Sequence, residues 1–241
     1  LRASSAASDV YKRQETNGMT EVEATGKFVK ALHNRKIEVY ALLGAVEWGY
    51  EEDGATLLAH LEKIVQYNVQ SSEKEKFDGV MLDIEPYISD SWKENPEEYM
   101  DRYISCMKKG YKFAQKNHLR TAICIPRHYD NQGLTSGLEE LIKETCDEVA
   151  VMNYSCGNEI EAIRTEAALS EKYGKELHCI LEFQEVGKHG LTENKTYRNK
   201  GIDNAKETWE KLQKEYKNIN VTRDYHWSRP VREMLEEKNA D

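Results

Sequence analysis

The chain has 241 residues, of which 39% are hydrophobic and 32% charged, and its formal net charge is −9 at pH 7. This composition is typical of a globular protein with a well-solvated surface, and the length fits one large domain. The acidic balance argues against a nucleic-acid-binding surface, and no run of about 18 apolar residues predicts a membrane span. We therefore expect no nucleic-acid partner and no membrane-spanning segment.

Five cysteines are spread over the sequence without a Cys-x-x-Cys pair, and their number is odd. Both observations argue against a disulfide framework or a cysteine-ligated zinc site. We expect Cys106, Cys124, Cys146, Cys156 and Cys179 to behave mainly as small buried hydrophobic residues. We expect no cofactor and no metal. Unpaired cysteines favour a cytoplasmic location, but they do not decide the localisation.

Residues 1–14 have no apolar periodicity, and the sequence does not begin with methionine. The segment also lacks the apolar core of a signal peptide. We interpret it as a non-native leader, so that the native N-terminus is missing and any secretion signal would be invisible. The remaining residues, 15–241, are expected to form one partial catalytic domain.

From residue 20 onward, helical and strand patterns alternate along the chain. Short apolar runs rich in β-branched residues predict strands over 37–44, 77–85, 121–126, 148–154, 177–183 and 219–225. Apolar residues at helical spacing predict helices over 20–34, 55–67, 95–117, 137–145, 158–174, 204–216 and 231–238. Strands that alternate with helices indicate a parallel sheet in an α/β protein.

Polar and aromatic residues gather where the predicted strands end, namely Glu47, Trp48, Asp83, Glu85, Arg127, His128, Asn153, Tyr154, Glu182, His226 and Trp227. A barrel builds its active site from many strand ends, whereas an open doubly wound sheet uses one switch point. No glycine-rich phosphate loop follows any strand, which weakens the nucleotide-binding alternative. We therefore predict a (β/α)8 TIM barrel that is incomplete, with about six βα units present.

The segment FDGVMLDIEPY, residues 77–87, is the most informative stretch of the sequence. Because strand side chains alternate between faces, Met81, Asp83 and Glu85 share one face, which we expect to be the barrel interior. Two neighbouring carboxyl groups resist simultaneous ionisation, so one of them should stay protonated near neutral pH. A protonated carboxylic acid is what a glycosidase needs to protonate its leaving group.

The pattern formed by Asp78, Gly79, Asp83 and Glu85 resembles the D-G-x-D-x-D-x-E signature of the chitinase-type, or family eighteen, glycoside hydrolases. In that family the signature ends the fourth barrel strand. The resemblance therefore implies that the six predicted strands are strands three to eight, and that the partner is a carbohydrate.

Two further segments lie in the matching order. Residues 151–154 resemble the family's M-x-Y-D motif on the sixth strand, and Trp227 stands where the family has an aromatic residue after the eighth. The resemblance implies that Glu85 is the general acid and that Asp83 orients the substrate's acetamido group, whose carbonyl attacks the anomeric carbon. It also implies that Tyr154 hydrogen-bonds that carbonyl, in a substrate-assisted retaining mechanism.

Three positions depart from the family pattern. Met81 replaces the middle aspartate of the signature, Ser155 replaces the aspartate after the tyrosine, and Pro86 stands where an aromatic residue is common. These departures weaken the prediction of an N-acetylhexosamine substrate more than they weaken the prediction of sugar hydrolysis. They leave open a catalytically inactive, carbohydrate-binding barrel.

Glu182, at the end of strand 177–183, leaves a second glycosidase mechanism open, in which it is the nucleophile and Glu85 the acid/base. A metal-dependent hydrolase using His128 and His226 with the carboxylates is a further alternative. Contacts to the sugar are expected from Trp48, Tyr87, Arg127, His128, Asn153, His226 and Trp227, because polar and flat aromatic groups at strand ends suit sugar binding.

Overall fold

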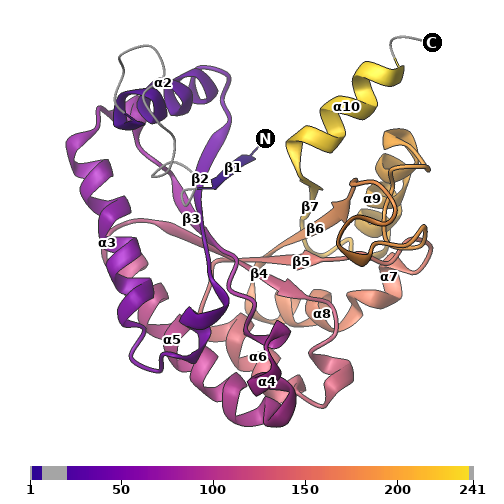
Figure 1. Ribbon diagram of the computed structural model, residues 1–241, viewed down its shortest axis with the longest axis horizontal. Helices are drawn as coiled ribbons and strands as arrows, with labels where there is room; N and C mark the ends of the chain where they lie inside the picture. The colour runs from indigo at the N-terminus through magenta and orange to yellow at the C-terminus, as the bar shows by residue number, and fades with distance from the viewer. Residues whose placement is uncertain (1, 7–20, 239–241) are drawn as a thin grey trace. The chain divides into compact units, whose positions relative to one another are not determined.

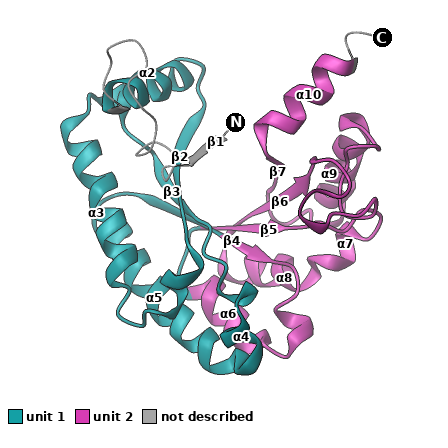
Figure 2. Ribbon diagram, viewed as in Figure 1, with its two compact units in different colours: residues 1–123, 144–147 teal, residues 124–143, 148–241 magenta. Residues whose placement is uncertain are grey.

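The computed structural model of the chain describes residues 2–6 and 21–238. Their elements fall into two compact units (Figures 1 and 2). Unit 1 comprises Leu1–Ile123 and Glu144–Asp147, and unit 2 comprises Cys124–Lys143 and Glu148–Asp241. No helix among the described residues combines the length and the apolar character that crossing a membrane requires.

Unit 1 is a parallel sheet with helices between its strands. Its strands pair in chain order and are β1 (Arg2–Ala6), β2 (Glu38–Leu43), β3 (Gly79–Leu82) and the first part of β4 (Arg120–Pro126). Its helices are α2 (Glu21–His33), α3 (Ala55–Gln70), α4 (Asp90–Glu94) and α5 (Pro96–Lys116), with short 3-10 helices η1 (Val46–Tyr50), η2 (Glu73–Glu75) and η3 (Pro86–Ile88).

Close packing between α3 and α5 shows why the core of unit 1 needs a small residue. A Cβ atom on Gly110 of α5 would lie 2.5 Å from Leu57 Cδ2 on α3. Leu57 and Leu61 of α3 are fully buried. The glycine therefore lets the two helices approach closely around these leucines.

Unit 2 repeats the same plan. Its strands β5 (Glu148–Met152), β6 (Glu176–Glu182) and β7 (Val221–His226) are parallel and again pair in chain order. Its helices are α6 (Thr135–Glu144), α7 (Glu159–Ala162), α8 (Arg164–Tyr173), α9 (Ile202–Glu215) and α10 (Ser228–Lys238), with 3-10 helices η4 (Asp130–Gln132) and η5 (Lys188–Gly190). In both units the strands pair in chain order, as the strands of a barrel do.

The predicted α/β class is confirmed, and parallel strands that alternate with helices are consistent with an incomplete TIM barrel. Each predicted strand and helix overlaps an observed one. The prediction of one helix over 158–174 was wrong, because Ile163 leaves the helical conformation at φ −126° and ψ 19° and separates α7 from α8.

Strand β1 was not predicted, since residues 1–14 were set aside as a leader. Arg2–Ala6 pair in parallel with residues 38–42 of β2. An edge strand offers unpaired backbone groups, so a short segment can join it without an apolar pattern of its own. The non-native origin of residues 1–14 stays a prediction, and residues 1 and 7–14 of this leader lie outside the described part of the chain.

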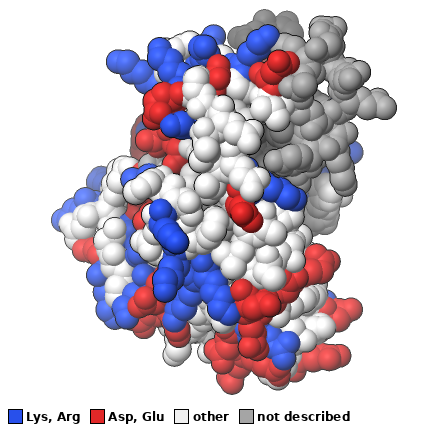
Figure 3. All heavy atoms as spheres, turned by 90° about the vertical axis from the view of Figure 1, so that its left-hand side faces the viewer, with Lys and Arg blue, Asp and Glu red and all other residues white. Residues whose placement is uncertain are grey.

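The surface and the cysteines agree with the composition. Lys and Arg side chains are interspersed with Asp and Glu side chains on the face drawn in Figure 3.

All five cysteines are free thiols, and Cys106, Cys124, Cys146 and Cys179 are buried, which confirms their expected packing role. Cys156 is only half-buried.

Candidate functional site

The exit of β3 in unit 1 presents the two predicted carboxylates. Val80, Leu82 and Ile84 are at most 1% exposed, whereas Asp83 and Glu85 are half-buried. This alternation confirms that the two carboxylates share one face of the extended segment. They leave the sheet just after β3 ends at Leu82.

A glycine on the neighbouring strand exit fixes the position of Asp83. The Asp83 backbone N–H donates to Leu43 O at 2.8 Å, and a Cβ atom on Gly44 would lie 1.8 Å from Asp83 O. No side chain fits in that space. The residue after β2 must therefore be glycine for the two strand exits to stay this close.

Glu85 is held by the turn that follows it. It precedes η3, and the hydroxyl of Tyr87 donates a hydrogen bond to Glu85 Oε2. Tyr50 in η1 donates to Pro86 O at 3.2 Å, which ties η1 to η3. Tyr87, predicted as a substrate contact, thus contacts the proposed general acid directly.

The remaining signature residues of unit 1 have structural contacts. Asp78 Oδ2 accepts from the Val39 backbone N–H at 2.6 Å and lies 2.8 Å from His33 Nε2, at the start of β3. A Cβ atom on Gly79 would lie 2.5 Å from Arg120 O. Asp78 and Gly79 therefore set the register of the strands and do not form part of the carboxylate site.

Trp48, expected to stack on sugar, lies on η1. Its ring packs on His60 of α3 with ring centroids 4.4 Å apart and an interplanar angle of 30°. The indole is half-buried. Its role as a sugar contact stays a prediction.

Glu182 is the centre of a hydrogen-bonded cluster in unit 2. It is the last residue of β6, and its side chain is 2% exposed. Its Oε1 accepts the backbone N–H groups of Phe183 and Gln184, each at 2.7 Å, and its Oε2 accepts the Gln184 amide at 3.2 Å. His226 Nδ1 lies 2.8 Å from Oε2.

These contacts decide the charge of Glu182. Burial raises the pKa of the Glu182 carboxyl, but the hydrogen bonds from His226 and Gln184 outweigh burial, so the pKa is lowered from its ordinary value. Glu182 is therefore held as a carboxylate. The sequence placed it at a strand end but could not show its partners.

His226 links Glu182 to two further predicted residues. It lies beside Glu182 in the β6–β7 register, and the Tyr154 ring stacks on the imidazole at a centroid distance of 5.9 Å. Trp227 follows through a cis peptide bond and is 45% exposed. The structure thus brings Glu182, His226 and Tyr154 together.

Asn153, expected to contact substrate, points into the protein. It is 1% exposed, and its amide donates to Glu159 O at 2.9 Å. This contact holds the start of α7 against the end of β5, which favours a structural role. Its substrate contact stays a prediction.

Arg127 and His128 follow β4 and are both half-buried. Burial and the neighbouring Arg127 guanidinium lower the pKa of His128 below its ordinary value. A neutral imidazole suits a hydrogen-bonding role. Their proposed contacts with sugar hydroxyls stay predictions.

Glu166 on α8 is a buried acid that the sequence analysis missed. It is fully buried, and neither carboxyl oxygen has a hydrogen-bond partner among the other described residues. The pKa of Glu166 is raised to about 7, mainly by burial and also by Asp130, while a hydrogen bond from its own backbone and the Arg127 charge oppose the rise. Its position on the apolar face of α8, beside Ala167 and Ser170, was the available signal. Full burial separates it from any substrate.

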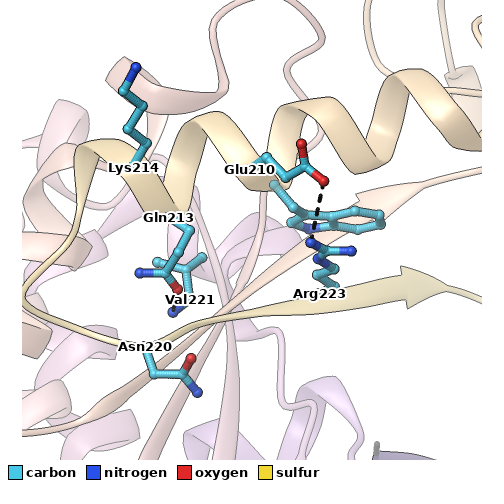
Figure 4. A pocket seen from close by; sticks show the side chains of 7 residues that line it. Glu210, Gln213, Lys214, Asn220, Val221 and Arg223 are labelled. Carbon is cyan, nitrogen blue, oxygen red and sulfur yellow. Dashed lines mark hydrogen bonds and ion pairs between the residues drawn. The ribbon is translucent and has the colours of Figure 1, made fainter.

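A pocket of about 460 Å³ lies between α9 and β7 (Figure 4), lined by Trp209, Glu210, Gln213, Lys214, Asn220, Val221 and Arg223. Glu210 and Arg223 approach to 3.7 Å across it. Because strand side chains alternate, Arg223 lies on the face of β7 opposite to His226. This pocket is therefore distinct from the Glu182 cluster.

No family model matches the chain, and no curated protein matches it. The solved structures with a similar fold include the following two. A xylose isomerase domain protein from Planctomyces limnophilus is 15% identical, with 91% of this chain and 80% of that chain covered and a TM-score of 0.52. A β-glucosidase is 13% identical, with 94% of this chain and 73% of that chain covered and a TM-score of 0.52. These likenesses support an incomplete TIM barrel.

Catalytic domain 2 of a group II chitinase from Ostrinia furnacalis is also similar, at 15% identity and a TM-score of 0.42. The match covers 71% of this chain and 54% of that domain, so the chain spans about half of its length. A likeness this weak establishes no shared fold. The resemblance to the family eighteen hydrolases therefore rests on the motif residues.

Proposed function

We propose that this chain is a glycoside hydrolase acting on a polysaccharide or oligosaccharide, with Glu85 as general acid and Asp83 assisting. The observation that carries the proposal is the exit of β3, where both carboxyl groups are half-buried on one face. Tyr87 orients the Glu85 carboxyl group through its hydroxyl. An acid placed in this way protonates the glycosidic oxygen as the bond to the leaving group breaks. A β-glucosidase has the same type of fold.

The finer mechanism that we propose is substrate-assisted retention. Asp83 would orient an acetamido group on the sugar, and the Tyr154 hydroxyl would hydrogen-bond the carbonyl oxygen that attacks the anomeric carbon. In support, the ring of Tyr154 is held by stacking on His226. Tyr154→Phe keeps this stacking and removes the hydroxyl, so it should lower kcat with little change in stability.

A second candidate mechanism uses Glu182 as a nucleophile. Its lowered pKa favours this role, because a nucleophile must be ionised. Its 2% exposure and its four hydrogen bonds oppose the role, since they leave little room for attack on a sugar. We therefore favour a positioning role for Glu182, which holds His226 at the strand end.

The test measures reducing-end release from β-linked polysaccharides, including chitin and peptidoglycan fragments. Glu85→Gln should lower activity by a factor of about 10² or more, as expected for loss of a general acid. Glu97→Gln, exposed in the first turn of α5, is the matched control and should keep full activity. If the wild type binds sugars but hydrolyses none, the chain is a carbohydrate-binding barrel instead.

Substrate choice separates the two mechanisms. Substrate assistance requires an acetamido group, so glucosides that lack it should not be cleaved. Cleavage of such glucosides, with activity lost in Glu182→Gln, would support the two-glutamate mechanism.

A further inference from the structure

One face of the unit 2 sheet carries a second group of polar side chains, at the end opposite to Glu182. Glu148 and Glu176 are the first residues of β5 and β6 and lie side by side in the parallel register. His178 follows two residues later and so points to the same face as Glu176. Its register neighbour on β5 is Ala150, whose small side chain leaves room for an imidazole ring.

The distances within this group suit metal ligation. His178 Nε2 lies 2.9 Å from Glu148 Oε2, and His178 Nδ1 lies 3.1 Å from Asp224 Oδ2 on β7. One ligand atom from each of Glu148, Glu176 and His178 lies within 4.8 Å of the other two. Tetrahedral ligands at about 2.1 Å from a zinc ion lie about 3.4 Å apart, so movements of about 1 Å would gather them.

The burial and the ligand types of the group also suit a metal ion. Glu148 and His178 are at most 1% exposed, and the Asp224 side chain is 24% exposed. Together, Glu148, Glu176 and His178 offer two carboxylates and one imidazole as possible ligands. A mixed set of imidazole and carboxylate ligands suits zinc better than magnesium or calcium, which prefer oxygen ligands alone.

We propose that Glu148, Glu176 and His178 form a zinc site at the amino-terminal ends of β5 and β6. Asp224 contacts His178 Nδ1 and so directs Nε2 toward the ion, as carboxylates behind metal-ligating histidines do. The ion clamps β5 to β6 and stabilises unit 2. This site does not depend on the proposed hydrolysis, since its residues lie at the other end of the strands.

The test uses the full chain after metal removal with EDTA and dialysis. ZnCl₂ is titrated into this protein while the heat of binding is measured, and the melting temperature is measured with and without ZnCl₂. We expect one zinc ion per chain and a higher melting temperature, with a weaker response to MgCl₂. Glu176→Gln and His178→Gln should lose this binding, and Asp224→Asn should weaken it about 10–100-fold. Glu207→Gln, exposed on α9, and Glu182→Gln are controls that should keep the wild-type affinity.

The rival arrangement is a protonated His178 that bridges Glu148 and Asp224 without any metal. It predicts no heat of binding and no change in melting temperature for the wild type, and that result would overturn the zinc site. Equal affinity in Glu176→Gln and the wild type would overturn it as well, because the ion would then bind elsewhere. Circular dichroism identifies the variants that fold. If His178→Gln does not fold, the zinc affinities of Glu176→Gln and Asp224→Asn decide between the two arrangements. Glu176 is only half-buried, so its replacement by glutamine should leave the fold intact.

Discussion

Replacement of Glu166 by glutamine is expected to stabilise the protein at neutral and alkaline pH. Glu166 is fully buried on α8, and burial raises its pKa to about 7 from an ordinary value of 4.5. The folded protein therefore keeps this carboxyl group protonated where the unfolded chain has already ionised it. Glutamine has the same shape and cannot ionise, so the substitution removes the cost of charge without opening a cavity.

The magnitude follows from proton linkage. Between pH 4.5 and 7 the folded state binds one proton more than the unfolded state at this residue, so stability falls by about 1.4 kcal/mol per pH unit. Over the whole interval the loss is about 3 kcal/mol, and it levels off above pH 7. The glutamine variant should be more stable by about 3 kcal/mol at pH 8 and by less than about 1 kcal/mol at pH 5.

Urea unfolding of the two proteins at pH 5 and pH 8, followed by circular dichroism, measures this difference. Glu171→Gln, exposed on the same helix, is the control and should change stability by less than about 0.5 kcal/mol at either pH. A Glu166→Gln variant that is destabilised at pH 8, or equally affected at both pH values, would refute the reasoning.

Two further predictions concern the strand exits. Gly44→Ala should destabilise the protein by about 3 kcal/mol or more and abolish activity, because the new Cβ atom overlaps the Asp83 carbonyl group, whereas Gly26→Ala on α2 should be neutral or mildly stabilising. Urea melts compare the two, and a fully stable Gly44→Ala would be inconsistent with the close contact. His226→Phe should cost about 1–3 kcal/mol at pH 7, because Glu182 loses a charged hydrogen bond. Because the pKa of Glu182 is lowered in the folded protein, its contacts stabilise the fold only while the carboxyl group is ionised. The difference in free energy of unfolding between the wild type and His226→Phe should therefore shrink as the pH falls. Urea melts that give the same difference at pH 3 and pH 7 would contradict this expectation.

The strands and helices followed from local patterns because buried parallel strands need apolar runs and the helices need an apolar face. Two features escaped this logic. Strand β1 pairs through its backbone along the edge of β2, so its side chains carry no signal. The break at Ile163 lies within a continuous helical pattern, and only backbone geometry reveals it.

The candidate site was predictable in position but not in contacts. Alternation placed Asp83 and Glu85 on one face, and the structure agrees. The hydrogen bond from Tyr87 to Glu85 and the hydrogen bonds that the Glu182 carboxylate accepts depend on the geometry of the turns after the strands. The spacing of residues in the sequence does not specify that geometry. The sequence did not predict the cluster around His178, because the barrel rule points to residues at the carboxyl ends of strands, whereas Glu148 and Glu176 are the first residues of their strands.

The most direct test of Glu85 as a general acid varies the leaving group. Glu85→Gln should lose a factor of about 10² or more on an oligosaccharide, whose leaving group needs a proton, relative to the wild type and Glu97→Gln. On a 2,4-dinitrophenyl glycoside of the same sugar, whose leaving group departs without protonation, the variant should stay within about tenfold of the wild type. An equal loss on both substrates, or no loss on the oligosaccharide, would contradict the assignment of Glu85 as the acid.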